Sequence, residues 1–301
     1  MVLRFSFYNQ VVITIPFEPI RAYRAKTFCL LPGSHIKNRE EAVEFVNQRG
    51  FVYFWPIKDI TFPSLWTAAA GDRPVADAHD DPGHVTWGWK DSLLGSREWY
   101  YAKILRKKAT MISMELAPYF YALSENFGAP EDDHISLYEQ GRLTQEAKSI
   151  YQAILDNGPL DTVALRKTAH LGSPESEGRF NKALADLQAG FLIVPVAVTQ
   201  AGAWHYAFAY DIVSRHYPDV AETARFIGEF DAQRKLTERF FSSVGAAQIR
   251  NLGMLFGWSS DQAQANIRYW VDSGLLRAGI QIENQPGEWF VLRSLTTIQG
   301  E

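Results

Sequence analysis

The sequence predicts an α+β protein that is mainly helical and carries β-hairpins. Hydrophobic residues make up 47% of the 301 positions, which is enough for a packed core. Helices with an apolar stripe are followed by pairs of short β-prone runs, and this order of elements recurs in the second half of the chain. These three observations exclude a disordered or fibrous chain.

The clearest order of elements lies between residues 144 and 210. Apolar residues form one helical stripe, namely Ala147, Ile150, Tyr151, Ile154 and Leu155. Asp161 is placed to cap a short second helix, and Ser173 with Pro174 is placed to begin a third, which ends at Gly190. The β-prone runs 191–198 and 204–210 then predict a hairpin. Three helices followed by a hairpin is the winged-helix order.

The same order recurs 84 to 86 residues later. Ser259 stands 86 positions after Ser173 as the cap of a third helix, and Leu275 stands 84 positions after Phe191 at the start of a hairpin over 275–282 and 289–295. A helix over 246–256 precedes them, and the segment 38–56 predicts a further, degenerate module. We therefore expect tandem winged-helix modules, with an N-terminal region over 1–135, a module over 136–218 and a second over 219–301.

Charge and cysteine content limit the classes of function. The net charge is −4, so binding to a polyanion needs a local basic patch. The single cysteine, Cys29, excludes an intrachain disulfide and indicates a reducing compartment, which we interpret as the cytoplasm. Residues 1–16 lack the features of a signal peptide, and no apolar run is long enough to span a membrane. We expect a soluble protein without a membrane partner.

The strongest signal for nucleic acid is a basic segment at 97–108. Five of its twelve residues are cations placed among aromatic residues, namely Arg97, Lys103, Arg106, Lys107 and Lys108. The alternative is a solvated helix face with a buried aromatic side. The third helices add only Arg179 and Lys182 in one module and Arg268 in the other, so sequence-specific reading of the major groove is not favoured.

A stretch rich in turn-forming residues, 72–90, predicts a loop that carries polar side chains. His79, Asp80, Asp81 and His84 could supply metal ligands or a general acid and base, although Asp before Pro-Gly is also an ordinary turn signature. In an extended segment, Trp87 and Trp89 would share one side, as a hydrophobic plug or a surface for stacking a base. No Gly-rich phosphate loop or nucleophile elbow is present, and no cofactor is expected.

Several stretches resemble the winged-helix DNA glycosylases of the AlkZ/YcaQ type, and more closely the AlkZ-related proteins. They are Gly50-Phe-Val-Tyr-Phe-Trp-Pro-Ile57, Pro63-Ser-Leu-Trp66, Gly71-Asp-Arg-Pro74, His79-Asp-Asp-Pro-Gly-His84, Thr86-Trp-Gly-Trp-Lys-Asp91, Gly158-Pro-Leu-Asp-Thr162 and Leu165-Arg166. The resemblance spans most of the chain. It implies three winged-helix elements around a concave DNA-binding face, a small β-rich C-terminal region, and excision of alkylated or crosslinked purines by hydrolysis of the N-glycosidic bond.

The chain departs from this family at the catalytic motif. Active members carry Gln-x-Gln or Gln-x-Asp where this sequence has Tyr53, Phe54 and Trp55, and neither a phenol nor an indole is a good general base at neutral pH. If this chain still hydrolyses the N-glycosidic bond, the carboxylates that could replace the motif are Asp80 or Asp81 of the nearby loop, or Asp59 three residues after Pro56.

Three hypotheses of function follow. The first is a protein that binds double-stranded DNA, including damaged DNA, with little sequence specificity. The basic segment, Arg179 and Lys182 would contact phosphates, and Tyr53 and Trp55 would stack on an unpaired base. The second is an active glycosylase with a rearranged carboxylate at Asp80 or Asp81. The third is a module whose winged helices bind protein.

Overall fold

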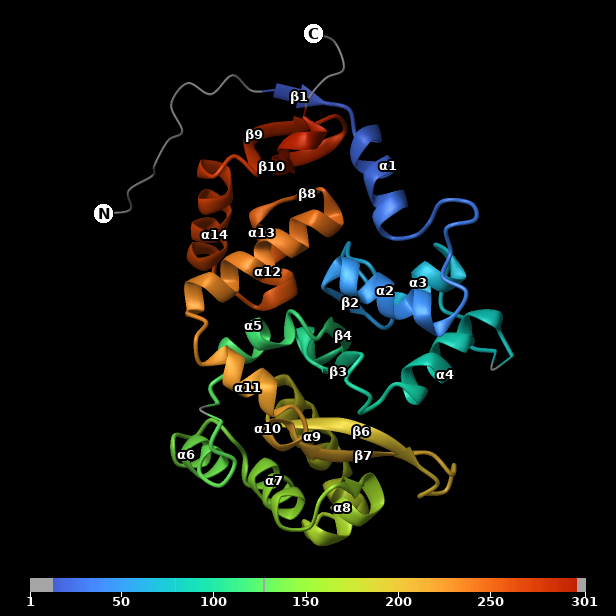
Figure 1. Ribbon diagram of the computed structural model, residues 1–301, viewed down its shortest axis with the longest axis vertical. Helices are drawn as coiled ribbons and strands as arrows, with labels where there is room; N and C mark the ends of the chain where they lie inside the picture. Colours follow the sequence, from blue (N-terminus) through green and yellow to red (C-terminus); the bar gives the residue numbers. More distant parts are fainter. Residues whose placement is uncertain (1–12, 79, 127, 297–301) are drawn as a thin grey trace.

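The computed structural model describes residues 13–78, 80–126 and 128–296. The described residues form three units of the same element order, helix–strand–helix–helix–strand–strand (Figure 1). Residues 1–12 and His79 lie outside the described residues. Most of the segment 1–16, in which we expect no signal peptide, is among them.

The first unit spans residues 39–113. It consists of α2 (Arg39–Arg49), β2 (Phe51–Tyr53), α3 (Leu65–Ala70), α4 (Val85–Ser92), β3 (Trp99–Lys103) and β4 (Ala109–Ser113). The strands form an antiparallel sheet in the order β2-β4-β3. Asn38 caps α2 by accepting a hydrogen bond from the Glu41 backbone N–H at 2.8 Å, and Ser64 caps α3 in the same way through Thr67 at 3.1 Å.

The second unit spans residues 145–212 and repeats this arrangement. Its elements are α7 (Gln145–Asn157), β5 (Leu160–Asp161), α8 (Thr162–Thr168), α9 (Glu177–Ala189), β6 (Ile193–Thr199) and β7 (Ala207–Ile212), with sheet order β5-β7-β6. Asp161 caps α8 through the N–H groups of Val163 and Ala164, as its position predicts. The expected hairpin and three helices are therefore present here, but Ser173 makes no capping hydrogen bond and α9 begins only at Glu177, after a 3-10 turn at Pro174–Ser176.

The third unit spans residues 229–292. It contains α12 (Glu229–Val244), β8 (Ala246–Ala247), α13 (Ile249–Phe256), α14 (Ser260–Asp272), β9 (Leu276–Ile282) and β10 (Gln285–Leu292). Its sheet order is β1-β9-β10-β8, because β1 (Ile13–Ile15) adds in parallel to β9. Ser259 caps α14 in a capping box with Gln262, as expected. The helix expected over 246–256 begins only at Ile249, since Ala246 and Ala247 pair with β10.

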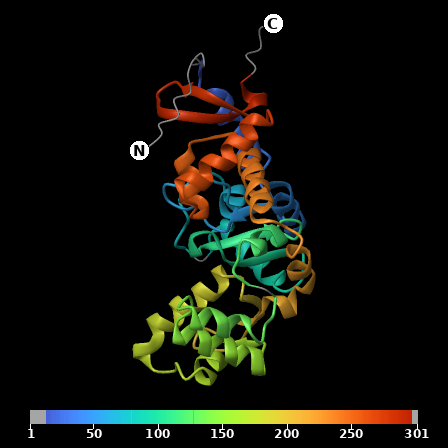
Figure 2. The same ribbon diagram turned by 90° about the vertical axis from the view of Figure 1, so that its left-hand side faces the viewer.

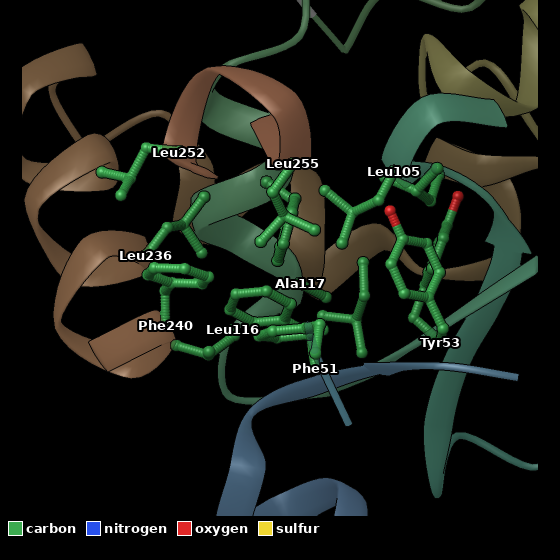
Figure 3. Close-up of a cluster of buried hydrophobic side chains, with 14 of the residues drawn as sticks. Phe51, Tyr53, Leu105, Leu116, Ala117, Leu236, Phe240, Leu252 and Leu255 are labelled. Atoms are coloured by element: carbon green, nitrogen blue, oxygen red, sulfur yellow. The ribbon is translucent and has the colours of Figure 1, made fainter. Parts of the chain in front are cut away.

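The first and third units share one hydrophobic core, although they lie far apart in the sequence. Phe62 of the first unit stacks on Phe240 of α12 with ring centroids 5.8 Å apart, and Phe51 contacts Phe256 of α13 at 5.8 Å. Figure 3 shows Phe51 and Tyr53 of β2 in the cluster that also holds residues of α12 and α13. The second unit has its own core beneath α7 and α9. The first and third units are therefore packed against each other through one continuous core.

Connecting helices complete the fold. They are α1 (Glu18–Thr27), α5 (Ala117–Ala122), α6 (Asp133–Glu139), α10 (Val213–His216) and α11 (Pro218–Ala224). Helix α1 is tied to the end of α12 by Arg24, which donates to the carbonyl oxygens of Val244 and Ala246 at 2.9 and 2.8 Å. Burial lowers the pKa of Arg24 to about 10. Figure 2 shows the β9–β10 hairpin and the second unit projecting to the same side, so the molecule is curved.

Two further local expectations, in the first unit, are wrong. The stretch expected to be a loop as far as Lys90 turns helical at Pro82–His84 and continues as α4, so Trp87 and Trp89 diverge instead of sharing a side. Trp89 is buried, whereas Trp87 is 44% exposed. The basic segment is the β3–β4 hairpin and its turn, Leu105–Lys107, so the alternative of a solvated helix face does not apply. No helix of the described residues is long and apolar enough to cross a bilayer.

Candidate nucleic-acid interface

Tyr53 lies inside the shared core and not at a surface. Successive residues of β2 point to opposite faces, and Tyr53 faces the cluster that contains Phe62, with its ring 1% exposed. Its hydroxyl has no hydrogen-bond partner among the described residues, and burial raises the pKa of Tyr53 to about 12. The structure therefore does not bring Tyr53 to a position where its ring could stack on a base.

Trp55, two residues further on, lies in a cluster of aromatic rings at the surface of the first unit. It is half-buried, and its ring lies 5.1 Å from that of Trp66 and 6.1 Å from that of Trp87. His84 contacts all three tryptophans, with centroid distances of 5.2 to 6.1 Å. The loop around Asp81 thus meets Trp55 through His84.

Asp81 is held by Arg73 and has a structural role. The two guanidinium nitrogens of Arg73 donate to the two oxygens of Asp81 at 2.6 and 3.0 Å, and the Gly83 N–H donates to the same carboxylate at 2.8 Å. These hydrogen bonds, first that from Arg73, lower the pKa of Asp81. A Cβ on Gly83 would lie 2.6 Å from the ring of Trp66, so this turn packs directly on the aromatic cluster.

Asp80 differs from its neighbour. It is exposed, and no hydrogen bond or ion pair of Asp80 is found within the described ranges. Asp59, the third carboxylate considered, is also exposed and adopts a left-handed backbone conformation with φ of +64°. Within those same ranges, no group of three His, Cys, Asp or Glu side chains could hold a metal ion.

The basic segment lies where the three units meet. The β3–β4 turn contacts α9 of the second unit and α13 of the third. Arg106 donates to the Met254 carbonyl at 2.9 Å, and Lys107 forms an ion pair with Asp186 of α9. Arg97, at the other end of β3, donates to the His216 carbonyl at 3.1 Å. Arg106 and Lys107 therefore join the first unit to the third and second units, and Arg97 joins the first unit to the connecting helix α10.

The other predicted contacts are mostly unpaired. Lys103 and Lys108 flank the β3–β4 turn, and both are exposed. On α9, Lys182 is exposed, whereas Arg179 pairs with Glu146 at 2.9 Å. No ion pair of Lys103, Lys108 or Lys182 occurs in the part of the chain that the structure describes.

Sequence reasoning missed the contact between the first and second units at Lys90. The Lys90 side chain is 4% exposed, and its ammonium nitrogen lies 2.6 Å from a carboxylate oxygen of Asp91 and 3.0 Å from the hydroxyl of Tyr206 in the β6–β7 hairpin. Burial lowers its pKa. The only local signal was a lysine directly after Trp87 and Trp89, and its partner Tyr206 is 116 residues away.

The hairpin also carries a highly exposed ring. Trp204, at the turn between β6 and β7, is 90% exposed, and Tyr206 beside it is 39% exposed. Figure 1 shows this turn at the free end of the β6–β7 hairpin, away from the cores. An indole so exposed contributes little to folding and leaves its ring accessible to solvent.

Comparisons with known proteins agree with this architecture. The structure resembles that of the DNA glycosylase AlkZ of Streptomyces sahachiroi, with a TM-score of 0.60 and 11% sequence identity, over 95% of this chain and 73% of that chain. At this identity the likeness shows a common fold. A comparison of the sequence with curated proteins finds no match. The family model described as AlkZ related matches residues 36–257, which is more than half of the sequence. The chain therefore belongs to the AlkZ-related family.

Proposed function

We propose that this protein binds double-stranded DNA with low sequence specificity, and that its three units are winged helices. The observation that carries the proposal is the threefold repetition of one element order with one strand order, in which the third helix precedes a hairpin. Helices in this position and the hairpins that follow them are elements that proteins place against DNA. The boundaries 1–135, 136–218 and 219–301 remain part of this proposal.

Phosphate contacts would come from the cations that the fold leaves unpaired. Lys103 and Lys108 are exposed beside the turn where the three units meet, and Lys182 is exposed on the third helix of the second unit. Exposed ammonium groups without carboxylate partners can replace the counterions of the DNA backbone, which gives affinity that depends strongly on salt and little on sequence. A net charge of −4 makes this local arrangement necessary for binding.

Trp204 would contact DNA in a different way. Proteins that deform a duplex often insert an apolar side chain between base steps, and an indole at the tip of a hairpin can reach a groove or an unpaired position. Its 90% exposure supports this role. The proposal replaces Tyr53, which lies in the core, with Trp204 as the ring that meets the bases.

The second candidate function is base excision by a rearranged glycosylase. The observation that favours it is Asp80, an exposed carboxylate in the loop that meets Trp55, with no partner among the described residues. Such a group could stabilise the positive charge that develops on the sugar when an N-glycosidic bond breaks. Asp81 is less suited, because Arg73 already neutralises it.

Two assays separate these functions. Fluorescence anisotropy with a labelled duplex should give binding at about 50 mM salt that weakens steeply by about 200 mM. Incubation with duplexes that carry N7- or N3-alkylpurines tests for release of free base, with Asp80→Asn as the variant and Asp81→Asn for comparison. The binding proposal predicts affinity without release. Release that Asp80→Asn abolishes would establish the second function, and absence of binding at about 50 mM salt would contradict the first and favour a protein partner.

A further inference from the structure

We propose that Trp87 and Tyr206 form a stacking surface for an unpaired nucleobase, and that Lys90 is the positioning residue that holds the two rings in place. This inference rests on the proposed DNA-binding function and names the part of the molecule that would receive a base. The rings come from separate units, Trp87 from α4 of the first and Tyr206 from the β6–β7 hairpin of the second.

The geometry of the rings fits a flat partner. Tyr206 and Trp87 lie within 24° of parallel at 6.4 Å, and Trp87 and His84 lie within 25° at 6.0 Å. Trp87 is 44% exposed and Tyr206 is 39% exposed, so both rings retain open surface. Every nucleobase has a flat π-face, and stacking on an exposed aromatic ring is the usual way in which proteins hold unpaired bases.

Lys90 lies behind these rings in an aromatic cage. Its ammonium nitrogen is 5.7 Å from the ring centroids of both Trp87 and Tyr206, and 4.6 Å from that of Phe208. Tyr101 and Phe54 complete the cage at 5.4 and 5.7 Å. Cation–π attraction and the hydrogen bonds among Lys90, Tyr206 and Asp91 thus fix the hairpin against α4.

Burial of the Lys90–Asp91 ion pair costs desolvation free energy that burial of an apolar side chain would not cost. Taking an ammonium group and a carboxylate out of water is unfavourable, and apolar residues of similar size are often as stabilising as a buried ion pair. Buried pairs of this kind are best known for specifying one arrangement of the chain. Lys90 therefore specifies where the rings of Trp87 and Tyr206 stand relative to each other.

The charge around the rings indicates the chemistry of the partner. Lys90 is paired with Asp91 beside these rings, and Arg73 is paired with Asp81 beside Trp66, so each of these ion pairs is neutral. Neither pair offers net attraction to a cationic peptide or to an isolated anion. A neutral flat group is the partner that this surface suits, and an unpaired base is such a group in the DNA that the rest of the molecule would hold.

The test compares two labelled duplexes of the same sequence, one fully paired and one with a single unpaired thymine. The wild-type chain should bind the second duplex roughly 5-fold to 100-fold more tightly, since stacking of one base has that effect. Trp87→Ala and Tyr206→Ala should remove the preference and leave affinity for the paired duplex unchanged. Tyr206→Phe keeps the ring but removes the hydroxyl that bonds Lys90 and Asp91, so it should retain only part of the preference. Phe230→Ala, which truncates a ring that is 67% exposed on α12, serves as the control.

Lys90→Met tests the positioning role. The variant keeps an unbranched apolar chain and removes the ammonium, so the paired duplex should bind as before while the preference for the unpaired thymine falls. A general loss of stability would weaken binding to both duplexes equally. Equal binding of both duplexes by the wild type, or a preference that survives Trp87→Ala, would overturn this inference and leave the proposed function intact. Failure to bind either duplex would contradict both.

Discussion

Arg73 and Asp81 form a two-pronged ion pair that closes the loop before α4, with nitrogen–oxygen distances of 2.6 and 3.0 Å. The guanidinium also lies over the ring of Trp66, 5.2 Å from its centroid. The loop that we considered as a hydrolytic site is thus held against the aromatic cluster through the carboxylate of Asp81, which binds Arg73.

The first prediction concerns the pH dependence of this anchor. The pKa of Asp81 is lower in the folded chain than in the unfolded chain, so its contribution to stability is present above the ordinary aspartate pKa, about 4, and is lost as the pH falls through the folded value. Thermal unfolding should show Asp81→Asn less stable than wild type at about pH 6, with the difference shrinking below about pH 4. Asp80→Asn should match wild type throughout. If Asp81→Asn were less stable than wild type by the same amount at both pH values, the ion pair with Arg73 would not be the cause of the difference.

The second prediction is that the Tyr53 hydroxyl is dispensable. Because this buried hydroxyl has no hydrogen-bond partner in the described part of the chain, Tyr53→Phe should leave the free energy of unfolding unchanged or raise it by up to about 1 kcal/mol. Tyr23→Phe is the matched control, since its hydroxyl donates to the Ser242 carbonyl at 2.7 Å and its loss should cost about 1 kcal/mol. Chemical denaturation measures both. A large loss of stability or of DNA affinity in Tyr53→Phe would show a role that the core position does not explain.

How far the sequence predicts the fold depends on the range of the interactions. Caps such as Asp161 and Ser259 act on residues two or three positions away, so the helices that they begin were predicted correctly. The two-residue strands β5 and β8 were missed, because two residues give no periodicity and only pairing with a distant hairpin defines them. Helix α4 was missed because Pro82, Gly83 and Gly88 are typical of loops.

The candidate site was less predictable for the same reason. The basic segment was recognised as a cluster, but its pairing depends on residues far along the chain, such as Asp186, which lies 79 positions from Lys107. The cage around Lys90 joins strands and helices of two units, and no local pattern contains it. The exposure of Trp204 follows from its place in the turn before β7, whereas the predicted hairpin placed Trp204 at the start of its second strand.

The third prediction concerns Trp204. Because its ring is 90% exposed, Trp204→Ala should change the free energy of unfolding by less than about 0.5 kcal/mol. Its affinity for duplex DNA should fall by roughly 5-fold or more if the ring contacts bases. Phe226→Ala removes an equally exposed ring, also 90%, between α11 and α12, and should leave affinity unchanged. Equal affinities for wild type and Trp204→Ala would remove this residue from the proposed interface.

The fourth prediction concerns the attachment of α1 to the third unit. Arg24→Met removes charged hydrogen bonds to the carbonyl oxygens of Val244, at the end of α12, and Ala246, in β8, and should lower the free energy of unfolding by about 1.5 to 3 kcal/mol. Arg21→Met, on the same helix, removes a side chain that is 70% exposed and paired with the exposed Glu18, so the change should stay within about 0.5 kcal/mol. Urea unfolding of both variants provides the comparison. If Arg24→Met and Arg21→Met lowered the free energy of unfolding by similar amounts, the hydrogen bonds of Arg24 to the carbonyl oxygens would not be what holds α1 in place.

The salt dependence of duplex binding tests the central claim most directly. The logarithm of the affinity should fall linearly with the logarithm of the salt concentration in the wild type, and the double variant Lys103→Gln/Lys108→Gln should bind more weakly with a slope reduced by about 2. Arg142→Gln, whose side chain pairs with Glu125, should retain the wild-type slope. Identical slopes for wild type and the double variant would contradict an interface at the β3–β4 turn.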